Sequence, residues 1–301
     1  MSPLLVVALV AAAVCAFCFI ASLVSKDNSW VDRLWSIVPV VYVWIFAIAA
    51  GLTDARLDVM AGLVTLWGAR LTFNFARKGG YTGVEDYRWE VLRSRMSPAQ
   101  FAVFNLLFIV LYQNAILVLI TLPAFTAFEN RAPFGLLDVL LTVLFLALLA
   151  GETLADQQQW AFHRHKAAAV AAGREPSPRF LQSGLFRFSR HPNFFFEQSQ
   201  WWVLFLFGAM AAGSLLQWTV LGAFLLTILF IGSTIFTRAS RDRSIRSTPR
   251  TRRRPRRSCR GSRGVPARRL APPRRSLTGC RVSGSTRPPS ARSWPRWRRA
   301  C

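Results

Sequence analysis

Seven long apolar stretches dominate the first 237 residues of this 301-residue chain. They lie near 3–24, 35–53, 58–76, 101–123, 134–155, 194–212 and 215–236. A helix needs roughly 20 apolar residues to cross a bilayer, and backbone groups cannot stay unpaired inside it. The pattern therefore predicts an all-α, polytopic transmembrane helical bundle of about seven helices. The first stretch is interpreted as a membrane helix because no basic residue precedes it, whereas a signal peptide begins with positive charge.

Lys and Arg are distributed unevenly between the loops. The connections after the first, third and fifth stretches carry 13 cations, while those after the second, fourth and sixth carry only Arg56 and Arg131. Cytoplasmic loops of membrane proteins are enriched in Lys and Arg. We therefore expect the N-terminus outside and the C-terminus in the cytoplasm, in an integral protein of a bacterial inner membrane. Arg70, in the third stretch, is expected to extend to the same cytoplasmic side.

The last 64 residues, 238–301, have a different composition. They contain 22 Arg, eight Pro, no Lys and one acidic residue, Asp242, so they carry +21 of the net charge of +24. One interpretation is a disordered Arg/Pro/Ser-rich tail that binds anionic lipid or RNA. The absence of Lys argues against an evolved basic tail, and we expect no nucleic-acid partner. Residues 1–237 carry only +3 and form the predicted transmembrane domain.

A shifted reading frame explains this tail better. Arg, Pro, Ser, Gly and Ala are the residues that G+C-rich DNA encodes when it is read out of frame. If the segment from Thr237 is back-translated with suitable synonymous codons and one G is restored after the first codon, it reads T-E-S-I-T-R-S-K-H-P-E-Y-A-A-Y. Residues 238–301 are therefore predicted to be a frameshift product, which the nucleotide sequence of the locus can test.

Polar residues follow the fifth apolar stretch at helical spacing. Glu152, Asp156, Gln159 and His163 are separated by four, three and four residues, which places them on one face of a helix. Ionisable groups near the end of a membrane helix commonly face the bundle interior and mark functional sites. A solvated extension of the helix is the alternative. His163 and His165 form a His-x-His pair, but alternate helix residues point apart, so no metal site is expected.

A second polar face lies on the third apolar stretch. Trp67, Arg70 and Asn74 are spaced to share one side of a helix. Such groups could line a cavity for a lipid substrate, or they could join helices by hydrogen bonds.

Basic residues gather before the sixth stretch. Arg187, Arg190 and His191 precede Pro192, which suits the first position of a helix because it has no N–H to lose. Free backbone N–H groups and the helix dipole favour an anion there, and Arg binds phosphate through two parallel hydrogen bonds. The segment predicts a nucleotide phosphate site at the membrane surface. Alternatively, these Arg residues are cytoplasmic anchors and Arg190 pairs with Glu197.

The same segment resembles a known family. Its motif is Gly184-Leu185-Phe186-Arg187-Phe188-Ser189-Arg190-His191-Pro192-Asn193-Phe194, followed by Glu197 and Trp201-Trp202. Further similarities are Ala155-Asp156-Gln157, Asp32-Arg33-Leu34-Trp35, Trp67-Gly68-Ala69-Arg70-Leu71 and the restored K-H-P-E-Y. Over roughly residues 26–237, the chain is similar to the steroid 5-alpha-reductase-like membrane family and, more closely, to its bacterial branch, the domain-of-unknown-function 1295 group.

This resemblance implies an NADPH-dependent reductase of a carbon–carbon double bond in a lipid or steroid-like substrate. The residues that it implies for cofactor binding are Asp156, Arg187, Arg190, His191, Asn193, Phe194 and Glu197. Tyr87 and Glu85 are the catalytic candidates, because the proton donor needs an acidic group near the substrate. The reductases' N-terminal Gln-Glu/Tyr pattern does not align here. The shifted tail also removes the K-H-P-E-Y segment, so this chain could be inactive.

Two other functions remain open. An isoprenylcysteine carboxyl methyltransferase-like enzyme would share the Arg-His-Pro…Glu helix start but would use S-adenosylmethionine, which carries no phosphate and needs fewer cations. A non-enzymatic membrane scaffold would need neither cofactor. The Asp156-Gln157 step and the pair Arg187 and Arg190 favour NADPH.

Overall fold

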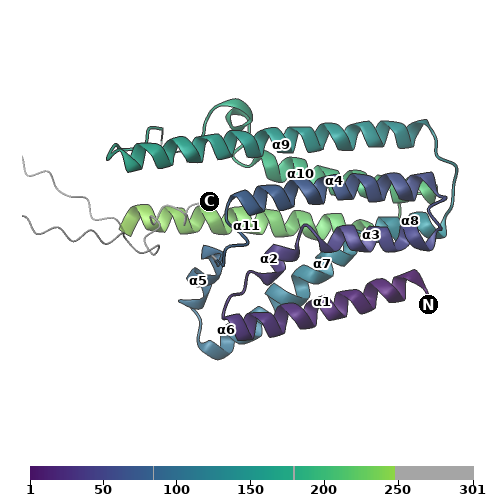
Figure 1. Cartoon of the computed structure of the whole chain (residues 1–301), viewed down its shortest axis with the longest axis horizontal. Helices are drawn as coiled ribbons and strands as arrows, with labels where there is room; N and C mark the ends of the chain where they lie inside the picture. Colours follow the sequence, from purple (N-terminus) through teal and green to yellow (C-terminus); the bar gives the residue numbers. More distant parts are fainter. Residues whose placement is uncertain (84, 179, 248–301) are drawn as a thin grey trace, which may run out of the picture. The chain divides into compact units, whose positions relative to one another are not determined.

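The structure is a computed structural model that describes residues 1–83, 85–178 and 180–247, with side chains described for all of these except 87 and 236–247. Every regular element in these residues is helical, as predicted (Figure 1). The chain divides into two units, Met1–Thr237 and Arg238–Cys301. The predicted frameshifted tail lies, from residue 248 onward, outside the described residues.

The helices follow one another with short connections. Their bounds are α1 Pro3–Ser25, α2 Trp30–Leu34, α3 Val38–Ala49, α4 Ala55–Arg77, α5 Tyr87–Arg93, α6 Pro98–Phe104, η1 Asn105–Tyr112, α7 Gln113–Leu119, α8 Leu122–Glu129, α9 Leu136–Ala171, η2 Gly184–Arg187, α10 Pro192–Ala211 and α11 Val220–Ser247.

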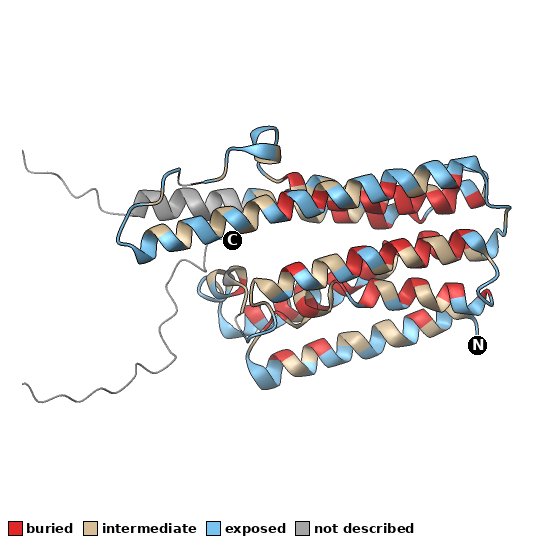
Figure 2. Cartoon of the chain, turned by 45° about the horizontal axis from the view of Figure 1, so that its top comes forward, coloured by how far each residue is buried: buried red, intermediate tan, exposed pale blue. Residues whose placement is uncertain are grey.

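Several of these helices have the dimensions of membrane spans. The runs that are long and apolar enough to cross a bilayer are Pro3–Ser25, Ala55–Arg77, Pro98–Glu129 and Leu136–Ala171. Val38–Ala49 and Val220–Ile235 are shorter apolar helices. Many large apolar side chains on α1 and α9 are exposed, which suits a helix surrounded by lipid. Figure 2 shows exposed positions along the outer sides of the long helices and buried positions where helices meet. The predicted all-α transmembrane bundle is confirmed.

α9 is much longer than the predicted stretch 134–155. Its 36 residues extend for about 54 Å at 1.5 Å per residue, whereas the hydrocarbon core of a bilayer is roughly 30 Å thick. Neither Gly nor Pro occurs between Gly151 and Gly173, and Gly173 takes a left-handed φ of 68° just beyond the helix. The apolar stretch ends near residue 155 because hydropathy falls there, but helix propensity does not. The helix therefore continues past Asp156 and His163, as their helical spacing indicated, and ends at Ala171.

The fourth predicted stretch, 101–123, is interrupted. It comprises α6, η1, α7 and α8. η1 is an eight-residue π-helix, in which backbone hydrogen bonds join residues five apart instead of four. Asn105, at the start of η1, donates from Nδ2 to Oγ of Ser22 on α1 at 2.9 Å. This buried hydrogen bond joins two helices inside the apolar region.

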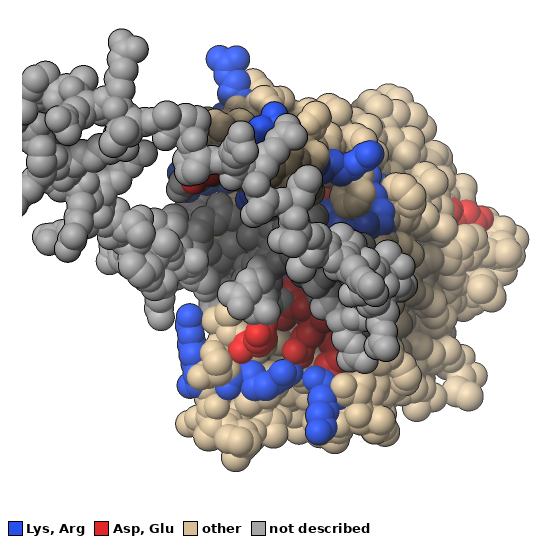
Figure 3. All heavy atoms as spheres, turned by 60° about the vertical axis from the view of Figure 1, so that its left-hand side comes forward, with Lys and Arg blue, Asp and Glu red and all other residues tan. Residues whose placement is uncertain are grey.

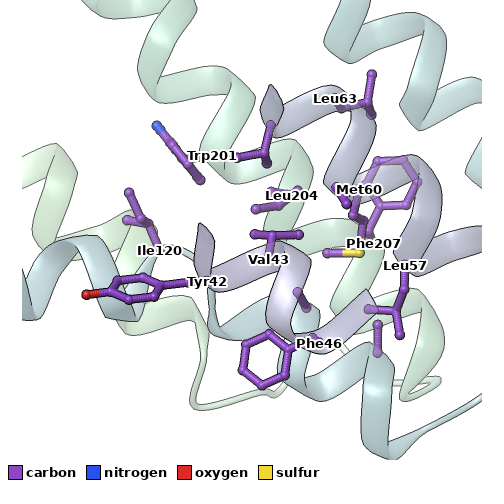
Figure 4. Close-up of a cluster of buried hydrophobic side chains, with 14 of the residues drawn as sticks. Tyr42, Val43, Phe46, Leu57, Met60, Leu63, Ile120, Trp201, Leu204 and Phe207 are labelled. Carbon is purple, nitrogen blue, oxygen red and sulfur yellow. The ribbon is translucent and has the colours of Figure 1, made fainter. Parts of the chain in front are cut away.

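An apolar core connects α3, α4, the end of α7 and α10 (Figure 4). Its labelled members in that view are Tyr42, Val43, Phe46, Leu57, Met60, Leu63, Ile120, Trp201, Leu204 and Phe207. α10 also approaches α8 closely, since a Cβ on Gly208 would lie 2.6 Å from the carbonyl oxygen of Pro123. This packing fixes α10, whose first half carries the polar residues considered next.

Candidate functional site

Three helices of the first unit bring ionisable and amide side chains together inside the bundle. α4 contributes Arg70, α9 contributes Glu152 and Asp156, and α10 contributes Glu197 and Gln200. The last four are buried, and the Arg70 side chain is 11% exposed. We call these five residues the buried polar cluster. Such groups are costly inside a membrane protein, so their convergence marks a functional candidate.

Ion pairs and hydrogen bonds connect most of the cluster. Arg70 places Nη2 at 2.7 Å from Oε1 of Glu152 and Nη1 at 2.6 Å from Oδ2 of Asp156. The two carboxylates are one helical turn apart, so a single guanidinium reaches both. Gln200 donates from Nε2 to Oε2 of Glu152 at 2.7 Å, and Lys78 Nζ lies 4.0 Å from Oδ1 of Asp156. The cluster thus links α4, α9 and α10.

Several buried polar atoms in and beside the cluster have no hydrogen-bond partner among the described residues. They are Arg70 Nε, Glu197 Oε1, Gln200 Oε1 and the indole nitrogens of Trp67 and Trp201. The two indole rings meet edge to face, with centroids 4.8 Å apart. An unpaired buried polar group costs about 1–3 kcal/mol. The arrangement therefore favours water or a ligand that offers both hydrogen-bond donors and acceptors.

The loop before α10 is attached to α9. Oε1 of Gln158 accepts a hydrogen bond from the backbone N–H of Leu185 at 2.9 Å. The preceding Gly184 has a left-handed φ of 61°, and a Cβ there would lie 2.4 Å from the same Gln158 oxygen. Glycine is therefore needed for this close approach. The attachment positions Arg187 and Arg190, whose side chains are both exposed.

α10 begins at Pro192, in agreement with the predicted helix start. The ring of His191 stacks on Phe194 at 5.4 Å, and Phe194 stacks on Phe230 of α11 at 4.8 Å. Asn193 is half-buried. The sequence-implied cofactor residues at this terminus are Arg187, Arg190, His191, Asn193 and Phe194. The other two, Asp156 and Glu197, belong to the buried polar cluster.

The predicted polar face of α9 is only partly buried. Glu152 and Asp156 are 1% and 3% exposed, whereas Gln159 and His163 are half-buried further along the helix. The first part of this face is therefore inside the bundle and the later part is partly solvated, because α9 leaves the bundle core between Asp156 and its end at Ala171.

The sequence did not predict the partners of Arg70. Its guanidinium lies against Glu152 and Asp156, and its expected extension toward the cytoplasmic side stays a prediction. Gln200 was not among the predicted site residues at all. One sequence pattern could have predicted this arrangement. A single Arg lies in one apolar span, and two acidic residues lie one helical turn apart in another span. Because unpaired charges are costly in a bilayer, such groups are expected to pair.

Glu85 belongs to a second network, in the loops that precede α2 and α5. Its Oε1 accepts hydrogen bonds from the backbone N–H and the side-chain amide of Asn28, both at 3.0 Å, and it pairs with Arg93. Among the described residues these contacts do not join Glu85 to the buried polar cluster. The side chain of Tyr87 lies outside the described part of the chain. The assignment of Glu85 and Tyr87 as catalytic stays a prediction.

The α2 segment lies between the two networks. Trp35, directly after α2, interacts with the carboxyl group of Glu197. Asp32, within α2, accepts a hydrogen bond from Nε1 of Trp89 at 3.2 Å and lies 3.7 Å from Nη2 of Arg88. Figure 3 views the end of the molecule that is at the left in Figure 1, where Asp and Glu side chains lie in a recess among Lys and Arg.

Asp32 is expected to make stability depend on pH. Burial raises the pKa of Asp32 to about 6, Asp86 adds to the rise, and Arg88, Trp89 and Arg33 oppose it. Because the folded pKa exceeds the unfolded value of about 4, the folded protein binds more protons, and its stability should fall as pH rises from about 4 to 6. With the side chain 18% exposed, we expect a loss of about 2 kcal/mol.

This expectation can be checked by comparing Asp32→Asn with the parent protein in thermal unfolding between pH 4 and pH 7. The variant should lose less stability over this interval, because it lacks the titrating carboxyl. Parallel pH profiles for the two proteins would contradict the assignment.

The profile of a family described as "Protein of unknown function (DUF1295)" matches residues 18–253. A protein of Schizosaccharomyces pombe named "Uncharacterized protein C594.04c" is 39% identical over 233 residues, covering 71% of this chain and 67% of the relative. No solved structure matches. This relative comes from a eukaryote, so it does not support the expected bacterial inner membrane.

Proposed function

Because this chain belongs to the DUF1295 family, whose sequences resemble steroid 5-alpha-reductase-like enzymes, we propose that it is an NADPH-dependent reductase of a carbon–carbon double bond. The proposed substrate is a lipid or a steroid-like molecule dissolved in the membrane. One observation carries the proposal most directly: exposed cations directly precede α10, and the first half of that helix holds buried polar atoms without partners.

The start of α10 suits the phosphates of the cofactor. Arg187 and Arg190 are exposed and form no ion pair among the described residues. The free backbone N–H groups at the helix start and the positive end of its dipole favour an anion. Guanidinium groups add bidentate hydrogen bonds to phosphate oxygens. This terminus would therefore hold the phosphates, including the 2′-phosphate that distinguishes NADPH from NADH.

The buried polar cluster suits the remaining part of the cofactor. Ribose hydroxyls and a carboxamide N–H are donors, and Oε1 of Glu197 and Oε1 of Gln200 are buried acceptors without a partner. The carboxamide oxygen is an acceptor, and Arg70 Nε and the indole of Trp201 are buried donors without a partner. The residues present thus fit both hydrogen-bonding roles of the group.

The chemistry follows from this placement. When bound, NADPH supplies a hydride to one carbon of a polarised double bond, and a proton on the neighbouring carbon completes the reduction. The residues of the chain would bind the cofactor, orient it toward the apolar interior and exclude water. Tyr87 and Glu85 remain the proposed sources of the proton.

The proposed topology agrees with this role. The cation-rich loops are assigned to the cytoplasm, and Arg187 and Arg190 belong to one of them. A water-soluble cofactor would then enter from the cytoplasmic side, in a bacterial inner membrane with the N-terminus outside.

A thermal-shift experiment in detergent tests the function. NADPH at about 100 times its Kd should raise the melting temperature by about 2–4 °C, and S-adenosylmethionine should leave it unchanged. The measurement is made on the present chain and on a frame-restored chain that regains the K-H-P-E-Y segment, where we expect the larger shift. Stabilisation by S-adenosylmethionine instead would favour the methyltransferase, and a lack of response to either compound in both chains would favour the scaffold.

A further inference from the structure

The buried polar cluster contains more acidic than basic groups. It has three carboxyl groups, on Glu152, Asp156 and Glu197, and one guanidinium, on Arg70, which pairs with Glu152 and Asp156. The next cation, Lys78, reaches only to 4.0 Å from Asp156 and lies toward the exposed edge, with its side chain 29% exposed. Arg70 is therefore the main positive charge that holds Glu152 and Asp156 together.

The geometry of Arg70 determines how those acids are oriented. Each terminal nitrogen is directed to a different carboxylate of α9, at 2.6 and 2.7 Å. Glu152 is then connected onward, because its second oxygen accepts from Gln200 on α10 at 2.7 Å. Arg70 thereby fixes two acids directly and fixes Gln200 through Glu152.

The same contacts leave other atoms available. With Glu152 bonded to both Arg70 and Gln200, the amide oxygen of Gln200 has no partner, and neither has Oε1 of Glu197 one turn earlier on α10. A flexible amide or carboxylate would lose rotational freedom on meeting a ligand, whereas one that is already fixed does not pay this cost at binding.

We propose that Arg70 is a positioning residue for the nicotinamide end of NADPH. It holds Glu152 and Asp156, and through Glu152 it orients Gln200 on α10, whose free amide oxygen would accept a hydrogen bond from a ribose hydroxyl or the carboxamide of the cofactor. This inference rests on the proposed function, and it separates two parts of the binding site: the phosphate part at the start of α10, and a deeper part that depends on Arg70.

The matched experiment compares two lysine substitutions on one helix. Arg70→Lys keeps the positive charge but removes the planar guanidinium, so one side chain can no longer bind two carboxylates through separate nitrogens. Arg56→Lys makes the same change at the other end of α4, where Arg56 forms a buried bidentate pair with Asp138. Glu152→Gln is added because it preserves the shape of the side chain while removing the charge that Arg70 binds. If Arg70→Lys does not fold, Glu152→Gln tests the same contact.

The readout is the Kd of NADPH and of 2′,5′-ADP, which carries the 2′-phosphate but lacks the nicotinamide. It is measured in whichever full chain, present or frame-restored, binds NADPH. Arg70→Lys and Glu152→Gln should weaken NADPH binding at least tenfold and leave the Kd of 2′,5′-ADP within twofold. Arg56→Lys should change neither Kd, although it lowers the melting temperature.

Two results would overturn the inference while leaving the proposed function intact. One is an NADPH Kd within twofold of the parent in both cluster variants. The other is an equal weakening of NADPH and 2′,5′-ADP, which would indicate a general structural defect. If no parent chain binds either compound, the proposed function fails first and the role of Arg70 falls with it.

Discussion

Replacing Arg187 and Arg190 together by Ala is expected to weaken NADPH binding about 100-fold, because each hydrogen bond to a charged group contributes roughly 1.5–3 kcal/mol, reduced here by exposure to solvent. Both side chains are exposed at the start of α10, so removing them should leave the fold intact. Equilibrium binding by isothermal titration calorimetry of the detergent-solubilised protein measures the change.

A matched control is Arg131→Ala, which removes an exposed Arg from the loop between α8 and α9. It should leave the Kd unchanged. Binding of NADH should respond less than binding of NADPH in the double variant, since NADH lacks the 2′-phosphate. An unchanged Kd for NADPH in a normally folded double variant would show that the phosphates bind elsewhere.

Arg56→Met is expected to cause the largest loss of stability, about 3–5 kcal/mol, because it leaves the carboxylate of Asp138 buried without its counter-charge. Arg56 places Nε 2.7 Å from Oδ1 and Nη2 2.9 Å from Oδ2 of Asp138, and the two side chains are only 4% and 3% exposed. Arg56 also donates to the carbonyl oxygens of Ala132 and Pro133 at 3.3 and 3.1 Å. The pair therefore attaches the loop before α9 to the start of α4.

Unfolding in mixed detergent, followed by circular dichroism, provides the measurement. Arg131→Met, an exposed change in the same loop, should alter the unfolding free energy by less than about 0.5 kcal/mol. The double variant Arg56→Met with Asp138→Leu should recover much of the loss, because it removes both charges. A single variant as stable as the parent would mean that water or lipid headgroups already solvate Asp138.

The helical fold could be predicted from the sequence because it depends on length and hydropathy. Apolar stretches of roughly 20 residues have few alternatives to helices in a bilayer. The end of α9 at Ala171 could not be found in this way, because hydropathy falls after residue 155 while the helix continues. The π-helical segment η1 was also missed, since no composition rule distinguishes it from an α-helix.

The candidate site could be predicted only in part. The start of α10 at Pro192 follows from local rules about helix termini, and the structure agrees with it. The partners of Arg70 depend on how α4, α9 and α10 pack, which spacing within one helix cannot reveal. Spacing did place Glu152 and Asp156 on a common face, and it is this pair that Arg70 bridges.

The excess length of α9 has a consequence for any reaction at this site. A 36-residue helix is longer than the hydrocarbon core of a bilayer is thick. The same helix therefore places residues in the hydrocarbon core at one end and in the aqueous phase at the other. Glu152 and Asp156 lie near the middle of α9. A polar reactant and a fat-soluble one could therefore meet there while each stays in the solvent it prefers.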